Sequence, residues 1–177
     1  MRVHITSVGV MSIPSSAAAS SGSSGSSDAS DASGSSASAA APGAPAPSVS
    51  FSDSVRELLD GRNFAAVATL GPDGAPQNSV VWIKREGDTV LFSSTEGRQK
   101  VRNLLRDPRV SVSVYDLANP YTSVEIRGTA EILPDPDKRL PHELSHKYLG
   151  IDPPAEKEDE IRVIVRVVPR RIVGFSA

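Results

Sequence analysis

Short β-type runs separated by tight turns fill much of the chain from residue 63 onward, and this pattern restricts the fold more than any other feature. Residues 63–70 and 77–85 flank a Gly-Pro-Asp-Gly turn, which predicts a hairpin. A second turn at 86–88 leads into a third run, residues 89–94. Three consecutive strands joined by short turns favour an antiparallel meander over the parallel sheet of a βαβ protein.

Further strands follow in the second half of the chain. Residues 109–115 alternate valine with polar side chains, which is the pattern of a half-buried strand. A long strand is predicted at 122–133, where Gly128 indicates a bulge or bend. The last two strands are expected at 160–168 and 171–175.

Helical spacing predicts three short helices, the last of them weakened by Pro141: residues 51–60, 97–106 and 137–149. Local hairpins nevertheless dominate the pattern. We therefore expect a mainly β (α+β) domain, a closed or nearly closed antiparallel barrel of about six or seven strands with short flanking helices.

Residues 1–50 have a different composition from the rest of the chain. Most of residues 15–50 are Ser, Ala, Gly or Pro, a composition that cannot bury enough apolar surface to offset the entropy of ordering. We predict a disordered segment at 1–50 and one folded domain at 51–177. The apolar run at 3–13 is interrupted by four polar residues and carries one flanking arginine, so a secretory signal is the weaker interpretation, and a later translation start is another.

Composition excludes several classes of protein. The formal net charge is −2, which gives no basic excess for nucleic acid or an anionic membrane. The chain has no cysteine, and no apolar run is long enough to cross a bilayer. His142 and His146 have the spacing of metal ligands on a helix, but no third ligand stands nearby in the pattern. We interpret them as a solvated helix face and predict no metal site.

Residues 93–104 are the best candidate for a binding site. They read Ser-Ser-Thr-Glu-Gly-Arg-Gln-Lys-Val-Arg-Asn-Leu and pass from a strand end into a helix. A helix N-terminus binds anions, and Ser93 and Ser94 add hydrogen-bond donors. Arg98 and Lys100 add full charges where the helix dipole disfavours cations by about 0.3–1 kcal/mol, so an anionic partner is favoured. A capped surface helix with basic side chains in water explains the same residues equally well.

The series T-x-G-R-Q-K-x-R-N-L-x-R-D-P-R-V at 95–110, with GPDGAPQNSVVWI at 71–83, resembles the pyridoxamine-5′-phosphate-oxidase-like family. Within that family the chain is most similar to the flavin- and deazaflavin-dependent oxidoreductases that use coenzyme F420. The resemblance covers residues 51–177. It implies a split β-barrel of the FMN-binding type.

The resemblance also implies a cofactor site. One strand would run beneath the ring, the 93–100 region would hold the phosphate, and a loop of a second protomer would complete the pocket. The implied residues are Gln77, Ser79, Val80, Ser93, Ser94, Arg98, Lys100, Asn119, Pro120 and Tyr121. For Arg127, a contact to the cofactor tail and an ion pair with Glu125 or Glu131 are equally compatible with the sequence. Trp82 could line the ring pocket, but it lies in an apolar run, which favours packing in the core.

The expected protein is a cytoplasmic homodimeric oxidoreductase. Reduced F420 would transfer hydride to an electron-poor small molecule such as an enone, a quinone or a bilin, and no side chain need act as a covalent catalyst. Two alternatives remain from the sequence. One is an FMN-dependent oxidase or reductase of the same fold, and the other is a non-catalytic module that binds a flavin or a tetrapyrrole.

Overall fold

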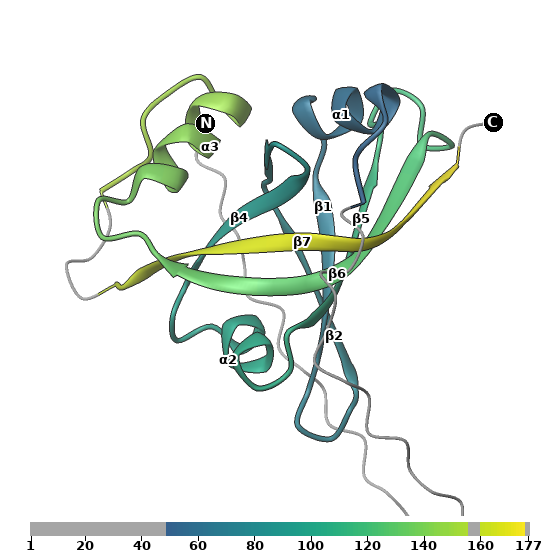
Figure 1. Cartoon of the computed structure of the whole chain (residues 1–177). Coiled ribbons are helices and arrows are strands. Elements are labelled where there is room, and N and C mark those ends of the chain that lie inside the picture. The colour runs from purple at the N-terminus through teal and green to yellow at the C-terminus, as the bar shows by residue number, and fades with distance from the viewer. Residues whose placement is uncertain (1–48, 156–159, 176–177) are drawn as a thin grey trace, which may run out of the picture. The chain divides into compact units, whose positions relative to one another are not determined.

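The computed structural model describes residues 49–155 and 160–175, and within them seven antiparallel strands form one sheet (Figure 1). The strand order is β2-β1-β5-β6-β7-β4-β3. The strands are β1 Ala65–Leu70, β2 Pro76–Val81, β3 Lys84–Glu86, β4 Thr89–Thr95, β5 Arg109–Tyr115, β6 Ser123–Pro134 and β7 Arg162–Phe175. The described helices are α1 Asp53–Asp60, α2 Gln99–Arg106 and α3 Arg139–Tyr148. The predicted mainly β, antiparallel fold with short flanking helices is confirmed, but the described sheet does not close into a barrel, because β2 and β3 at the two ends of the strand order do not pair.

The predicted disordered segment, residues 1–50, lies outside the described residues except for Val49 and Ser50. Its disorder, and the domain boundary that it implies, stay predictions. The first described helix, α1, is capped by Ser52, whose side chain accepts a hydrogen bond from the Val55 N–H.

The core follows the alternation in the sequence. Val110, Val112 and Val114 of β5 are buried, as the pattern predicts, and they pack in one cluster with residues such as Ile126 and Phe92. A second, smaller cluster lies at α3: Leu91, Leu140, Leu144, Tyr148 and Ile164, with Trp82 and Leu133 packed against it. This second cluster supports the site described below.

The predicted strand at 77–85 is wrong as a single element. It breaks at Trp82 and Ile83, so that β2 pairs with β1 at one end of the sheet order and β3 pairs with β4 at the other. The backbone N–H and carbonyl of Ile83 bond to side chains instead of to a neighbouring strand. Its N–H donates to the Tyr148 hydroxyl (3.2 Å), and its carbonyl accepts from the Lys147 Nζ (2.9 Å). The expected simple meander is therefore replaced by two hairpins linked through this break.

The two predicted terminal strands form one strand, β7, along the whole of β6. The pairing register shifts between Arg127 and Gly128, opposite Pro169 and Arg171, so the predicted irregularity at Gly128 is confirmed. A Cβ at Gly128 would lie 2.1 Å from the Val168 carbonyl oxygen. Only glycine fits there without a backbone shift.

Pro141 does not interrupt α3, contrary to the expectation. It occupies the first turn, where a backbone N–H has no partner within the helix and proline is tolerated. The buried Asp135 carboxylate accepts hydrogen bonds from the N–H groups of Arg139 and Leu140 and so replaces a side-chain cap. The helix therefore starts before the proline and runs through it.

Candidate cofactor site

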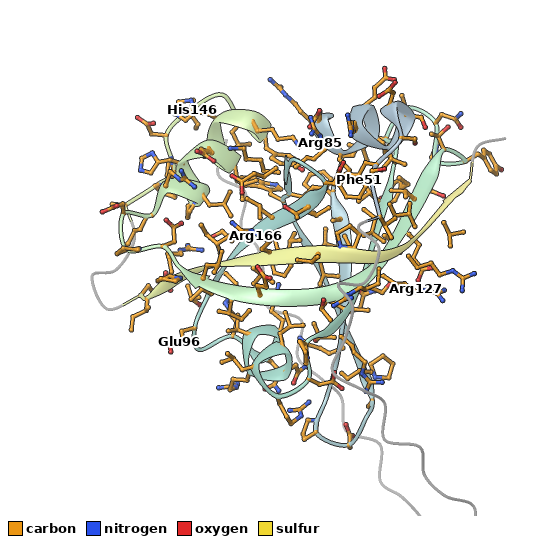
Figure 2. All side chains as sticks on the ribbon, in the orientation of Figure 1. Phe51, Arg85, Glu96, Arg127, His146 and Arg166 are labelled. Carbon is orange, nitrogen blue, oxygen red and sulfur yellow. The ribbon has the colours of Figure 1, made fainter. Side chains whose placement is uncertain are left out.

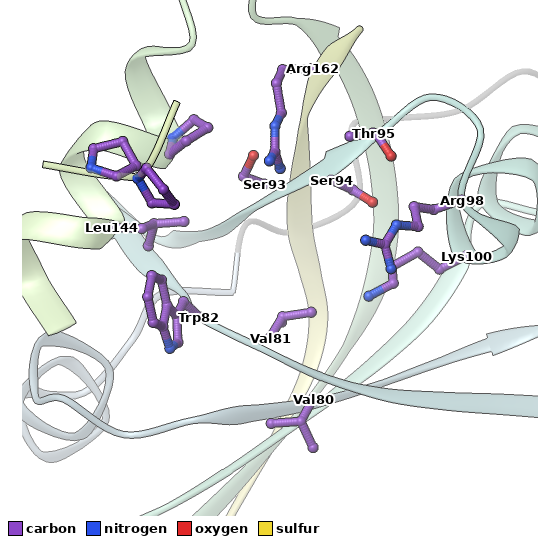
Figure 3. A pocket seen from close by; sticks show the side chains of 13 residues that line it. Val80, Val81, Trp82, Ser93, Ser94, Thr95, Arg98, Lys100, Leu144 and Arg162 are labelled. Carbon is purple, nitrogen blue, oxygen red and sulfur yellow. The ribbon is translucent and has the colours of Figure 1, made fainter. Parts of the chain in front are cut away.

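A pocket of about 360 Å³ opens between the end of β4, the start of α2, α3 and the residues that join β2 to β3 (Figure 3). It brings together segments that are far apart in the sequence. Its walls are formed by Val80, Val81, Trp82, Ser93, Ser94, Thr95, Arg98, Lys100, Pro141, Leu144, Pro153, Pro154 and Arg162. Five of the ten predicted site residues line it: Val80, Ser93, Ser94, Arg98 and Lys100.

The end of β4 supplies the hydroxyl side of the pocket. Ser93 and Ser94 pair with Ile164 and Val163 of β7, which fixes their backbone in the sheet. Ser94 is buried, and the Ser93 hydroxyl is shielded from solvent with no hydrogen-bond partner in the described part of the chain. A buried hydroxyl without a partner is unfavourable, so the Ser93 Oγ is suited to bond a ligand in the pocket.

The start of α2 supplies two positive charges. Arg98 is the N-cap residue and makes no side-chain capping bond, so its guanidinium is not held by the helix backbone. Neither Arg98 nor Lys100 has an ion pair with any carboxylate in residues 49–155 and 160–175. Burial, and secondarily the charge of Arg98, lowers the pKa of Lys100. Two unpaired cations at a helix N-terminus favour a bound anion.

Arg162 is a third basic residue at this pocket, and the sequence reasoning missed it. It pairs with Thr95 across the β4–β7 ladder, which brings the first residue of β7 beside the end of β4. Its side chain is 21 % exposed and lies 3.9 Å from the Glu160 carboxylate. Figure 3 shows its guanidinium directed toward Ser93 from the opposite side of the pocket to Lys100.

The remaining wall is apolar. The Trp82 ring stacks on the Tyr148 ring with centroids 5.1 Å apart and planes 5° apart, and the other apolar contacts come from residues such as Leu144 and Pro153. Trp82 is half-buried and lines the pocket while it packs on the second cluster. Both interpretations that the sequence left for Trp82 therefore apply. The pocket combines a cationic side with an aromatic and aliphatic side.

Gln77 and Ser79 do not line the pocket. The Gln77 Oε1 accepts a hydrogen bond from the buried Asn103 amide (3.0 Å), in a polar network that joins β2 to α2. The Ser79 hydroxyl is shielded and has no partner in the described residues. Because side chains alternate along a strand, Val80 faces the other way and reaches the pocket.

Asn119, Pro120 and Tyr121 also lie away from the pocket of their own chain. They belong to the exposed loop between β5 and β6, which ends beside the C-terminal end of β7 (Figure 1). The pocket lies at the other end of β7, at Arg162. A strand of this length spans roughly 40 Å, so one chain does not bring the two sites together.

Arg127 forms the ion pair that the sequence left as an alternative. Its guanidinium donates to both oxygens of Glu125 at 2.9 and 2.7 Å.

Tyr148 is buried, with its hydroxyl donating to the Asn63 carbonyl (2.6 Å) and accepting from the Ile83 N–H. Tyr148 therefore acts on the pocket through Trp82.

The open antiparallel sheet with three short helices has a fold of the split β-barrel type, and it carries a pocket with basic side chains at one end. Residues 51–174 match the family model described as pyridoxamine 5′-phosphate oxidase, and the chain belongs to this family. The family predicted from the motif at 95–110 is thus confirmed.

Three similar proteins illustrate the range of the family. A solved structure described as an F420 reductase is 39% identical, with a TM-score of 0.61, over 67% of this chain and 94% of that one. A conserved hypothetical protein from Mycobacterium tuberculosis is 27% identical, with a TM-score of 0.59, over 73% of this chain and 88% of that one. A pyridoxine/pyridoxamine 5′-phosphate oxidase from Kineococcus radiotolerans is 30% identical over 84 residues, which are 48% of this chain and 37% of that protein. The chain thus matches little more than a third of the length of this curated relative.

None of the helices in the described part of the chain has the length and the apolar character that a bilayer span requires. The longest of them, α3, has 10 residues.

Proposed function

We propose that the protein is an oxidoreductase that binds coenzyme F420 in the pocket beside α2 and uses it to reduce an electron-poor small molecule. The observation that carries the proposal is the convergence of Arg98 and Lys100, without carboxylate partners in the described residues, on a pocket whose other side is aromatic. An F420-type cofactor has an anionic tail and a flat ring, which match these two sides. The 39% identity to a protein described as an F420 reductase supports the same cofactor.

The protein's own residues would divide the binding work between them. Arg98, Lys100 and Arg162 would hold the anionic group by charge-assisted hydrogen bonds, and the Ser93 hydroxyl would donate one more. The Trp82 ring, which stacks on the Tyr148 ring, would pack against the cofactor ring or the substrate. When bound, the cofactor supplies a hydride donor. No side chain of the pocket is needed as a nucleophile, because positioning and electrostatics are the protein's share of such a reaction.

The proposal includes a homodimer. Asn119, Pro120 and Tyr121 resemble cofactor-contacting residues of the family, yet they lie at the far end of β7 from the pocket of their own chain. A second copy would bring this loop to the pocket of the first. Two-fold pairing is also the commonest form of homo-oligomer. Sedimentation analysis that finds a monomer with full cofactor affinity would contradict this part of the proposal.

FMN is the second candidate cofactor, because the motif at 95–110 also resembles FMN-binding members of the family, and the curated relative is named as an oxidase. A parallel titration of the cofactor-free protein with F420 and with FMN, followed by fluorescence, separates the two. The proposal predicts saturable F420 binding at a lower concentration than FMN. Tighter FMN binding, with electron transfer to oxygen, would favour the oxidase instead.

Catalysis requires a second measurement. The F420-loaded protein, with the cofactor reduced, is mixed with a panel of enones, quinones and bilins, and oxidation of the cofactor is followed by absorbance. Substrate-dependent oxidation supports a reductase. Tight binding of F420 with no oxidation by any member of the panel favours a non-catalytic carrier module.

A further inference from the structure

Two histidines that the cofactor pocket does not use share the outer face of α3. His142 and His146 are four residues apart, so their side chains project on the same side of the helix. The buried residues Leu140, Leu144 and Tyr148 occupy the opposite side. Both imidazoles are accessible, with 54% and 57% of their side-chain surface exposed, and Figure 2 shows His146 at the periphery of the domain.

The chain after α3 brings a carboxylate to these histidines. Gly150 adopts a left-handed conformation (φ 74°), and its N–H bonds the carbonyls of Ser145 and His146 at 3.1 Å. This turn reverses the chain, and Asp152 lies back against α3. The Oδ1 atom of Asp152 is 2.7 Å from the His146 Nε2 and 3.7 Å from the His142 Nδ1. The sequence pattern offered no third ligand because this reversal is not visible in residue spacing.

We propose that His142, His146 and Asp152 form a binding site for a divalent transition metal ion, with Zn²⁺ the best match. The three donor atoms all lie within 4.8 Å of one another. Tetrahedral Zn²⁺ with bonds of about 2.0–2.2 Å holds its ligands about 3.4 Å apart. The two nitrogen–oxygen distances, 2.7 and 3.7 Å, fall on either side of this value, so small side-chain rotations would complete the site.

The donor set agrees with this choice of metal. Imidazole nitrogen suits zinc, copper and nickel, whereas magnesium and calcium prefer sites made of oxygen alone. In tetrahedral coordination, two imidazoles and one carboxylate fill three positions, and water can take the fourth. Ion pairs of both histidines with Asp152 would give the same distances, but exposed pairs of this kind contribute little to stability, so pairing alone gives the three groups little reason to converge.

A metal at this site would act on the cofactor pocket through the chain. Pro153 and Pro154 follow Asp152 directly and form part of the pocket wall together with Pro141 and Leu144 of α3. A metal ion bound by Asp152, His142 and His146 would hold the segment with Pro153 and Pro154 against α3. The site itself does not depend on which cofactor the pocket binds.

The experiment titrates the untagged full-length chain, without cofactor, with Zn²⁺ in a calorimeter at neutral pH. Co²⁺ is used as a second probe, because its visible absorption reports the coordination geometry. The proposal predicts one ion per chain. His142→Ala, His146→Ala and Asp152→Asn should each weaken binding by at least the 10- to 100-fold that loss of a mere supporting group produces.

Two control variants keep their affinity. His4→Ala removes the only other histidine of the sequence, and Asp137→Asn removes an exposed carboxylate just before α3. Thermal melting of each variant without metal verifies that it is folded. No saturable Zn²⁺ or Co²⁺ binding, equal affinity in the three ligand variants, or binding lost in His4→Ala would overturn the proposal. If the wild-type protein bound the metal ion but did not bind F420, that result would contradict the proposed function and leave the metal site standing.

Discussion

Two groups of basic side chains in this domain differ in the partners that the chain provides. Arg109 and Arg127, on the neighbouring strands β5 and β6, each bind a carboxylate two residues earlier, Asp107 and Glu125. Hydrogen bonds from these arginines lower the pKa of Asp107 to about 2 and also lower that of Glu125. At the pocket, Arg98 and Lys100 have no such carboxylate in the described residues.

The difference shows where the domain is prepared for a ligand. An arginine beside its own carboxylate is already neutralised, so it has little to gain from an anion in solution. Arg98 and Lys100 instead repel each other, and burial lowers the pKa of Lys100. An anion that binds both would relieve the repulsion and restore the favourable environment that burial removed.

The largest expected effect comes from reversing the pocket charge. The double variant Arg98→Glu/Lys100→Ala should lose roughly 3–6 kcal/mol of F420 binding free energy, because two charge-assisted contacts disappear. Its melting temperature should stay equal to or above that of the wild type, since two unpaired cations are removed. Calorimetric titration and thermal melting measure the two quantities. A large drop in melting temperature would mean that these side chains support the fold.

Arg162→Ala should have a smaller effect on affinity, about 1.5 kcal/mol, the lower end for a charged hydrogen bond. Glu160 lies 3.9 Å from the guanidinium and already neutralises part of its charge. The same titration measures it. An effect as large as that of the double variant would show that the anion sits at β7 and not at the start of α2.

Lys147 extends the comparison to a second half-buried lysine. Burial lowers its pKa from 10.5 to about 8, although its Nζ bonds the carbonyls of Leu59 and Ile83. The unfolded chain then binds more protons than the folded one between pH 8 and 10.5, so this residue makes stability rise with pH in that window. Urea denaturation across the window should show a steeper rise in the wild type than in Lys147→Met, because Lys100 contributes a rise of the same sign to both proteins. An identical pH dependence in both proteins would contradict the shift.

The smallest effect is expected from an arginine that already binds a carboxylate. Arg127→Ala removes an exposed ion pair, and exposed pairs contribute little. Both F420 affinity and the urea midpoint should match the wild type within error. A clear loss of affinity would place Arg127 in a cofactor contact made across a dimer.

The sequence predicted those parts of the site that are close together along the chain. Ser93, Ser94, Arg98 and Lys100 lie within eight residues, so a strand end and a helix start suffice to bring them together. Arg162 and Pro153 reach the same pocket only because β7 pairs with β4 and the chain turns at Gly150. No local pattern encodes these contacts.

The fold, like the site, was predictable where neighbouring residues determine it and not where distant residues do. The hairpin turn at 71–74 and the valine alternation of β5 predicted their elements closely. The break at Ile83 was not predictable, because it depends on a hydroxyl and an ammonium 65 and 64 residues away in the sequence. The continuous β7 likewise depends on the glycine that faces it in β6.

The most direct test compares two single variants of α2 in an F420 titration. Lys100 lines the pocket, whereas Arg102, two residues further on, bonds Gln99 on the exposed side of the helix. Lys100→Ala should weaken F420 binding by about 10- to 150-fold, the equivalent of about 1.5–3 kcal/mol, and Arg102→Ala should leave it unchanged. Equal affinity in the wild type and both variants would contradict the claim that this corner of the domain holds the anionic group of the cofactor.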